Sequence, residues 1–341
     1  MALAGPVLGH LDPQFLALLD STNDRLRQVF ATTNALTLPL SGTGSAGMEA
    51  SFVNFVRPGD PVVVGVNGVF GVRMCEVASR HGAEVVRVDA EWGEPIDPDR
   101  LLAAHPAPSM IAVVHAETST GVRNDIEQLG KRKGDALLLV DMVTSLGGIE
   151  VDVDGWSVDV GYSGTQKCLG VPPGLAPFTA SARALERIVD RPSSWYLDLN
   201  LLARYVNDSS GGARVYHHTA PVVMVAALHA GLGVLLDEGL STSWARHAEC
   251  GRLLQDGLTD LGLELLVLAD HRLPQLTTVR IPAGVDDAAV RRELLSTYGI
   301  EIGAGAGRLA GQVWRIGCMG HTARRRNVVA LLGALKEVLE R

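Results

Sequence analysis

The chain has 341 residues, of which 47% are hydrophobic and 20% charged, and its formal net charge at pH 7 is −8. This length predicts one large domain with a smaller one, or two similar domains, and the composition excludes a disordered chain. The acidic balance argues against nucleic acid or an anionic membrane surface as the main partner, since both require a basic face.

The cysteines and the start of the chain predict a reducing compartment. No C-x-x-C pair and no metal-ligand spacing occur among Cys75, Cys168, Cys250 and Cys318. We therefore expect free thiols and no metal site. The first ten residues lack the features of a signal peptide, and the longest apolar stretch, 222–236, is short for a membrane span. We expect a cytoplasmic protein, in which the glycosylation triplet at Asn207 is a chance match.

In the first half of the chain, short β-branched runs alternate with segments of helical pattern. Buried strands are predicted at 61–66, 84–89, 110–115 and 136–141, with weaker ones at 158–162 and 176–179. Helices are predicted near 45–55, 69–81, 97–104 and 123–133. Strands that are apolar on both faces and separated by helices predict an α/β fold, with a mostly parallel sheet covered by helices on both sides.

The second half predicts a smaller α+β unit. One long helix is expected from about Ala220 to Leu261, with Pro221 in its first turn. After it we expect strands at 263–267, 276–281 and 312–316, and helices near 286–298 and 322–340. We place the boundary near residue 239, which gives a large domain at 1–238 and a small C-terminal domain at 239–341.

Residues 41–47 read Ser-Gly-Thr-Gly-Ser-Ala-Gly, which matches the G-x-G-x-x-G pattern of dinucleotide sites. A dinucleotide site also needs an acid at the end of the following strand, but this strand ends at Asn67 and Asp60 lies before it. Pro39, just upstream, is unfavourable in a central strand because it cannot donate to the ladder. Small residues that open a helix direct backbone N–H groups at an anion, so we expect a phosphate site that need not bind a dinucleotide.

Two charged residues at the ends of predicted strands suggest what carries that phosphate. Lys167 lies between a buried strand and the rigid Pro172-Pro173 pair, and a desolvated amine is a Schiff-base nucleophile. Asp141 ends an apolar strand, where a carboxylate needs a cationic or hydrogen-bonding partner. A phosphate cradle, a buried amine and a buried carboxylate are together what pyridoxal phosphate requires.

With these residues assembled, the sequence resembles the alanine–glyoxylate/serine–pyruvate aminotransferase family, class V of the fold-type I pyridoxal phosphate enzymes. The resemblance covers nearly the whole chain. It is carried by Leu40-Ser-Gly-Thr-Gly44, Gly65-Val-Asn-Gly-Val-Phe-Gly71, Glu117-Thr-Ser-Thr-Gly121, Val140-Asp141, Ser145-Leu-Gly-Gly148, Tyr162-Ser-Gly-Thr-Gln-Lys-Cys-Leu169, Pro172-Pro-Gly174, Tyr216-His-His-Thr219 and Arg315-Ile-Gly317.

The resemblance implies a role for each matched residue. Lys167 would form the Schiff base with the cofactor, and Asp141 would pair with the ring nitrogen. Arg315 would bind the substrate carboxylate, although it could also be an edge-strand charge facing water. The other implied cofactor contacts are Thr43, Gly44, Ser45, Phe70, Thr118, Val143 and Gln166, with Tyr216 and Thr219 reaching the neighbouring subunit of a homodimer. Phe70 would stack on the ring, although it could also be plain core.

The implied activity is a ping-pong transamination from a small amino acid, alanine or serine, to an oxo acid, glyoxylate or pyruvate. One departure concerns the Gly-Pro-Gly-Pro-like segment with which the family begins, because Met1-Ala-Leu-Ala-Gly-Pro6 leads directly into the chain. The wall that this segment forms beside the substrate would be missing or replaced. The alternatives are a lyase, desulfurase or aminoethylphosphonate-type transaminase of the same fold, and a degenerate homologue that binds the cofactor without catalysis.

Overall fold

The computed structural model describes residues 3, 5, 7–206 and 214–340, so the triplet at Asn207 lies outside the described residues. A seven-stranded sheet forms the centre of the larger unit, with the strand order β1-β9-β8-β7-β4-β2-β3. Its strands, in chain order, are β1 (Leu36–Ser41), β2 (Pro61–Val66), β3 (Glu84–Asp89), β4 (Met110–Val114), β7 (Leu137–Asp141), β8 (Val160–Tyr162) and β9 (Leu175–Ala180). The five strands from β8 to β3 run parallel, and β9 and β1 add antiparallel pairs.

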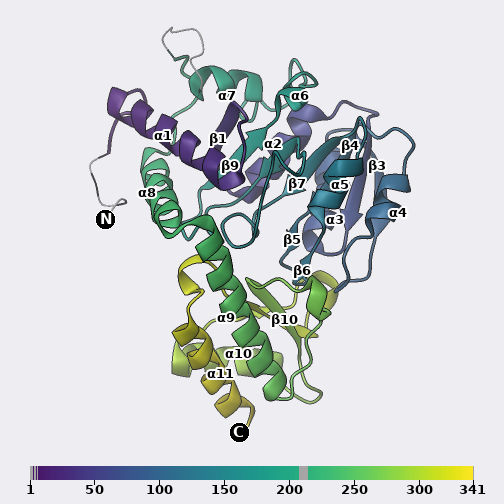
Figure 1. The fold of residues 1–341 in the computed structure, drawn as a ribbon, viewed down its shortest axis with the longest axis vertical. Coiled ribbons are helices and arrows are strands. Elements are labelled where there is room, and N and C mark those ends of the chain that lie inside the picture. Colours follow the sequence, from purple (N-terminus) through teal and green to yellow (C-terminus); the bar gives the residue numbers. More distant parts are fainter. Residues whose placement is uncertain (1–2, 4, 6, 207–213, 341) are drawn as a thin grey trace.

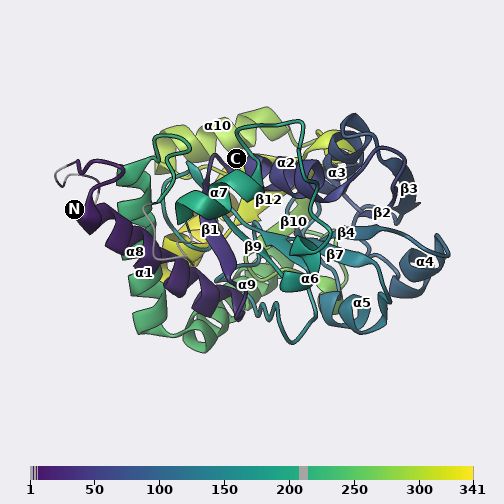
Figure 2. The same cartoon turned by 90° about the horizontal axis from the view of Figure 1, so that it is seen from above.

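Helices cover both faces of this sheet. They are α1 (Pro13–Phe30), α2 (Gly44–Phe55), α3 (Val69–Arg80), α4 (Pro98–Ala103), α5 (Ile126–Arg132), α6 (Ala182–Leu185), α7 (Leu199–Val206) and α8 (Val222–Glu238). Seen from above, α2 and α3 lie on one face and α4 and α5 on the other (Figure 2). The central strands β4, β7 and β8 are buried along their whole length, as the apolar runs predicted. The α/β prediction with a mostly parallel sheet is confirmed.

The first strand shows where proline can enter a sheet. β1 carries Pro39 and lies at the edge, where it pairs only with β9 and sets Pro39 opposite Pro177. An edge strand tolerates the missing donor that a central strand would need. The segment from 36 to 40 is therefore a strand, although not the central strand of a dinucleotide fold.

The smaller C-terminal unit has its own hydrophobic core and lies below the large sheet in Figure 1. A three-stranded antiparallel sheet has the order β10-β12-β11. The elements of this unit are α9 (Leu240–Asp260), β10 (Leu276–Arg280), α10 (Asp287–Tyr298), β11 (Gly303–Ala304), β12 (Val313–Gly317) and α11 (Arg325–Leu339). A further two-stranded sheet, β5 (Ala116–Glu117) with β6 (Val122–Arg123), lies in the large unit beside it.

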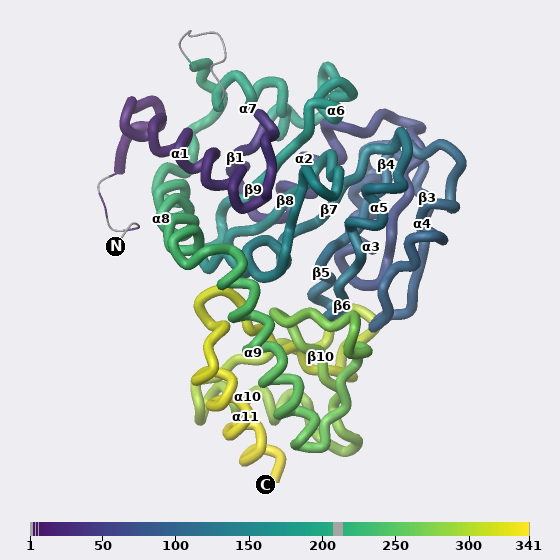
Figure 3. Tube along the Cα trace, viewed as in Figure 1, coloured from purple at the N-terminus to yellow at the C-terminus, as the bar shows by residue number. Residues whose placement is uncertain are grey.

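Two predictions for this half are wrong. The single helix expected from 220 to 261 is two helices, α8 and α9, whose axes differ by 84° (Figure 3). Gly239 makes the break, since its φ of +86° ends α8 in a conformation that favours glycine. The expected strand at 263–267 is irregular and contributes only one isolated bridge, from Leu265 to Val279. Among the described residues no single helix is long and apolar enough to span a membrane, and α8 and α9 meet that criterion only as this bent pair.

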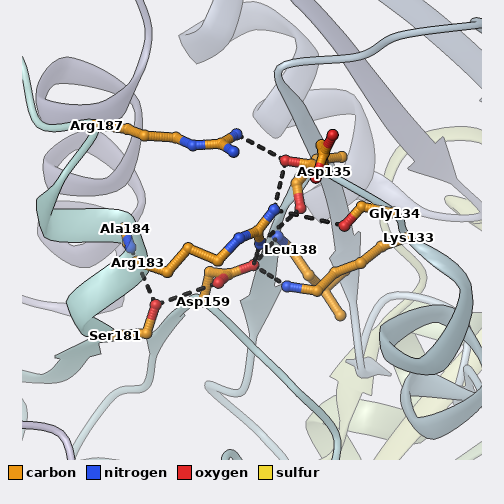
Figure 4. A network of polar contacts seen from close by, with 10 residues as sticks. Lys133, Gly134, Asp135, Leu138, Asp159, Ser181, Arg183, Ala184 and Arg187 are labelled. Carbon is orange, nitrogen blue, oxygen red and sulfur yellow. Dashed lines mark hydrogen bonds and ion pairs between the residues drawn. The ribbon is translucent and has the colours of Figure 1, made fainter.

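A buried ion-pair network lies at the amino ends of the central strands (Figure 4). The carboxylate of Asp159, just before β8, pairs with Lys133 and with the Arg183 guanidinium at 2.9 Å. It also accepts hydrogen bonds from the Leu138 N–H at 2.8 Å and the Ser181 hydroxyl at 3.2 Å. These contacts join the end of α5 to β7, β8 and the start of α6, and so fix the strands whose opposite ends carry the chemical residues.

Candidate active site

The chemical residues gather at the carboxyl ends of β4, β7 and β8. Asp141 is the last residue of β7, and Lys167 follows β8 by five residues. Thr118 lies just after β5, beyond the end of β4, and is buried. Ligands of open parallel sheets bind at this edge, where the strand ends deliver side chains to one crevice.

Asp141 is fully buried and hydrogen bonded on both oxygens. Its Oδ1 accepts the Val143 N–H and its Oδ2 accepts the Tyr162 hydroxyl, each at 2.8 Å. Burial raises the pKa of Asp141 to about 6, although both hydrogen bonds and the Lys167 charge act in the opposite direction. A cationic partner would therefore stabilise the ionised form of this buried carboxylate.

The Lys167 amine interacts electrostatically with both the Asp141 carboxylate and the Arg315 guanidinium. Burial lowers the pKa of the half-buried Lys167 amine, and the Arg315 charge lowers it further, while Asp141 raises it. Arg315 lies on β12, the central strand of the small sheet, so it is not an edge-strand charge. Its Nε donates to the Ala304 carbonyl at 2.8 Å and its Nη1 to the Thr118 carbonyl at 3.3 Å. These bonds hold the guanidinium across the boundary between the two units.

The amino end of α2 forms an open cradle for an anion. Thr43 caps this helix without a side-chain hydrogen bond, and both Thr43 and Ser45 are exposed. A Cβ at Gly44 would lie only 2.7 Å from Val143 Cγ2, so the absence of a side chain lets the cradle approach the residue beside Asp141. The helix dipole and free first-turn N–H groups favour a phosphate here.

Phe70 is half-buried in the first turn of α3, with the Arg73 guanidinium 5.1 Å from its ring centroid. Its backbone N–H donates at 3.1 Å to Glu117, a buried carboxylate one residue before Thr118. This bond connects Phe70 to the strand end that carries Thr118. The Phe70 side chain packs against the edge of the large core, so its stacking on a cofactor stays a prediction.

The remaining predicted residues lie further out. Gln166 is exposed next to Lys167. Tyr216 and Thr219 are both exposed and contact each other, with 3.4 Å between their hydroxyl oxygens. His218, which lies between them in the sequence, places its Nε2 2.7 Å from the hydroxyl of Ser41, the last residue of β1. Tyr216 and Thr219 therefore face solvent on the single chain and do not join the cluster around Asp141.

Comparison with known proteins identifies the family of the chain. The family model described as "Aminotransferase class-V" matches residues 4–320. The chain belongs to the class-V aminotransferases. The solved structure of an alanine–glyoxylate aminotransferase from Nostoc sp. is 47% identical with a TM-score of 0.95, over 99% of this chain and 90% of that one. That of a ureidoglycine–glyoxylate aminotransferase from Bacillus subtilis is 39% identical with a TM-score of 0.96, over 100% and 89%. An alanine–glyoxylate aminotransferase of Drosophila melanogaster is 38% identical, over 99% of this chain and 88% of that protein.

The predicted family, enzyme class and cofactor are confirmed by these matches, and class-V aminotransferases use pyridoxal phosphate. The residues present fit that group. Asp141 offers a desolvated carboxylate for a protonated ring nitrogen, and Lys167 offers an amine with a lowered pKa. The uncapped end of α2, with Gly44 at its first position, offers backbone donors for a phosphate. Among the described residues no cluster of three or more His, Cys, Asp or Glu side chains is arranged to hold a metal ion.

Three residues of this class-V aminotransferase site escaped the sequence reasoning: Tyr162, Glu117 and Ser119. Tyr162 and Glu117 both lie in stretches that resemble the family, but only the fold shows that the tyrosine hydroxyl reaches Asp141. Ser119 donates its hydroxyl to Glu117 Oε1 at 2.5 Å. Their place in the sequence could have indicated them, because all three residues end or follow a predicted strand at the same edge of the sheet as Asp141 and Lys167.

Proposed function

We propose that the protein transfers the amino group of alanine or serine to glyoxylate or pyruvate, by a ping-pong reaction in which the first keto acid leaves before the second oxo acid binds. The observation that carries the proposal is the cluster of Asp141, Lys167 and Arg315, which joins a buried carboxylate, a desolvated amine and a fixed guanidinium. Alanine and glyoxylate are named in relatives that match nearly the whole chain, and pyruvate is named in a further structural neighbour, whereas serine is implied by the family resemblance alone.

In this proposal Arg315, Lys167 and Asp141 each have a separate role in substrate binding, proton transfer or cofactor binding. Arg315 binds the substrate carboxylate through its planar fork, which the Thr118 and Ala304 carbonyls hold in place. Lys167 would hold the cofactor, and its free amine would take the proton from the substrate α-carbon, a role suited to an amine with a lowered pKa. When bound, pyridoxal phosphate supplies an electron sink for the electron pair left on the α-carbon when its C–H bond breaks. Asp141 keeps its ring nitrogen protonated.

The other contacts bind and orient the cofactor. Thr43, Gly44 and Ser45 hold the phosphate at the amino end of α2, and Gln166 lies alongside. Phe70 would stack on one face of the ring, Val143 would support the other and Thr118 would lie close by. The structure favours this arrangement because Gly44 packs against Val143, whose N–H donates to Asp141.

A desulfurase is disfavoured by the cysteine next to the catalytic lysine. Cys168 is buried, and its thiol lies 3.1 Å from the Thr144 carbonyl that accepts its hydrogen bond. Burial raises its pKa to about 12. A desulfurase needs a mobile thiolate, which this packed, protonated thiol does not provide.

We also propose a cytoplasmic homodimer with shared sites, in which Tyr216 and Thr219 reach the phosphate of the neighbouring subunit. The cradle residues Thr43 and Ser45 are exposed on the single chain, so a second copy would close the site. The exposed aromatic side chains of Trp195 and Tyr216 provide apolar surface for that contact. The division into domains at 1–238 and 239–341 is part of the proposal, and the two large cores and the break at Gly239 support it.

The test is a panel of amino donors and oxo acids with the cofactor-loaded protein. Amino transfer is expected with alanine or serine and glyoxylate or pyruvate, and release of sulfide or an aldehyde instead would contradict the proposal. Lys167→Ala should lose turnover and the visible absorbance of the bound cofactor. Lys131→Ala, on the exposed face of α5, is the matched control and should keep both.

A mixture of inactive variants tests the shared site. Lys167→Ala and Tyr216→Ala are each expected to lose activity alone. A heterodimer of the two contains one intact site, so random mixing should restore about a quarter of wild-type activity. No recovery in a mixture that sediments as dimers would refute sharing between subunits.

A further inference from the structure

Glu117 is a buried carboxylate to which the proposed reaction gives no role. It lies at the end of β5, and its two oxygens face only donors. Oε1 accepts the Ser119 N–H at 3.0 Å and the Ser119 hydroxyl at 2.5 Å. Oε2 accepts the N–H of Phe70 at 3.1 Å and that of Gly71 at 3.4 Å. One side chain therefore bridges the loop beside Thr118 and the first turn of α3.

The first turn of α3 depends on this bridge. Gly68 caps the helix and provides no side-chain hydrogen bond of its own. The Val69 N–H donates to the Ser119 hydroxyl at 2.8 Å, so Glu117 and Ser119 together receive the N–H groups of residues 69–71. The fit is close, because a Cβ at Gly68 would lie 2.3 Å from Glu117 Cδ and 2.4 Å from Ser119 Oγ.

A carboxylate is the group that satisfies this arrangement. Both oxygens face donors, so an amide of the same size would set its NH₂ against an N–H on one side or the other. The positive end of the α3 dipole also favours a negative charge at this place. Burial raises the pKa of Glu117 to about 7 and the Asp141 charge adds to this, while the bonds from Ser119 and Gly71 lower it. Such a costly buried charge is consistent with a specific task.

We propose that Glu117 is a positioning residue of the active site, which fixes the first turn of α3 and thereby holds the Phe70 ring against the cofactor. This inference rests on the proposed function, in which Phe70 stacks on the cofactor ring. The same segment holds the Thr118 carbonyl that receives Arg315 Nη1 at 3.3 Å. Glu117 thus fixes the position of the Phe70 ring relative to Arg315, which donates to the Thr118 carbonyl.

Glu117→Gln tests the proposal through cofactor binding, which does not depend on knowing the substrates. Aromatic stacking contributes about 0.5–1.5 kcal/mol, so cofactor affinity measured by fluorescence titration should fall about two- to twelvefold. The visible circular dichroism of the bound cofactor should also change, because the ring loses its fixed neighbour. Glu127→Gln, exposed in the first turn of α5, is the matched control and should alter neither quantity.

A double-mutant cycle with Phe70→Leu separates positioning from a structural role. If Glu117 acts through Phe70, Glu117→Gln in the Phe70→Leu background should weaken cofactor binding less than about twofold further. A full additional loss there, or an unchanged dichroism in the single variant, would overturn the proposal.

Ser119→Ala provides a second route if Glu117→Gln does not fold. It removes one donor to Glu117 and the acceptor of the Val69 N–H. It should change the dichroism in the same direction, and an unchanged dichroism would refute the proposal. Failure of the substrate panel with an intact cofactor signal would refute the proposed substrates and leave the assignment of Glu117 standing.

Discussion

Replacing Asp141 with asparagine is expected to stabilise the cofactor-free protein while it inactivates the enzyme. Asparagine has the same shape, and its oxygen can accept the Val143 N–H that now lies 2.8 Å from Oδ1. Its NH₂ can donate to the Tyr162 hydroxyl, now 2.8 Å from Oδ2, because that hydroxyl can rotate to accept. The substitution therefore removes a buried charge and keeps both hydrogen bonds.

The size of the effect follows from the pKa of Asp141, which burial raises from 3.8 to about 6. The folded protein binds this proton more tightly than the unfolded chain, so the contribution to stability is complete below about pH 4 and is lost as the pH rises through 6. Two pKa units correspond to about 3 kcal/mol as an upper limit, which the asparagine variant regains. For a chain of 341 residues, that is a rise in Tm of up to about 4 °C.

Thermal denaturation of the cofactor-free protein at pH 5 and pH 8 measures this effect. The stability gap between Asp141→Asn and the wild type should be largest at pH 8 and about half as large at pH 5. Asp256→Asn, exposed on α9, should show no such gap. In the loaded enzyme, loss of the charge should lower turnover about a hundredfold or more. A variant that melts below the wild type at pH 8 would refute the reasoning about the buried charge.

Three further predictions concern Arg315, Gly44 at the amino end of α2, and the Asp159 ion-pair network at the amino ends of the central strands. Arg315→Lys keeps the charge and loses the planar fork, so the KM for the amino donor should rise about tenfold or more with a smaller change in kcat; an unchanged KM would contradict the assignment. Gly44→Ala places a methyl group 2.7 Å from Val143 Cγ2 and should weaken cofactor binding in a fluorescence titration, whereas Gly333→Ala, with open space around it, should not. Asp159→Ala leaves Lys133 without its buried partner and should cost about 3–5 kcal/mol in urea denaturation, and a loss below about 1 kcal/mol would show that the network is dispensable.

Sequence reasoning succeeded where a single segment carries its own signal. The apolar runs of β4 and β7 predicted their strands because strands buried on both faces show no alternation. The order of strand ends then located Asp141 and Lys167 at one edge of the sheet. Helix α1 went unassigned, although Asp12 accepts the Gln14 N–H and Pro13 opens the helix, both of which are helix-start signals.

Features that depend on distant packing could not be predicted. Residues of helical pattern continue on both sides of Gly239, so the sequence predicts one helix, whereas in the fold Gly239 adopts a φ of +86° and the chain bends there. The segment at 263–267 has strand-like composition, but it gains a single bridge to β10. Glu117 lies in a stretch that resembles the family, but the N–H groups that it and Ser119 accept come from residues 69–71 of α3, which are distant in the sequence.

Arg315 lies on a strand of the C-terminal unit, while Asp141 and Lys167 lie in the large unit, and each unit has its own hydrophobic core. The two units are docked by a small apolar cluster of Ala116, Ile149 and Leu273 and by polar contacts, among them the Gln275 amide donating to the Thr144 carbonyl at 3.0 Å and the Ser243 hydroxyl to the Gly147 carbonyl at 2.8 Å. If Arg315 binds the substrate carboxylate as proposed, substitutions confined to the C-terminal unit would change which acid is recognised while Asp141 and Lys167 keep their positions in the large unit.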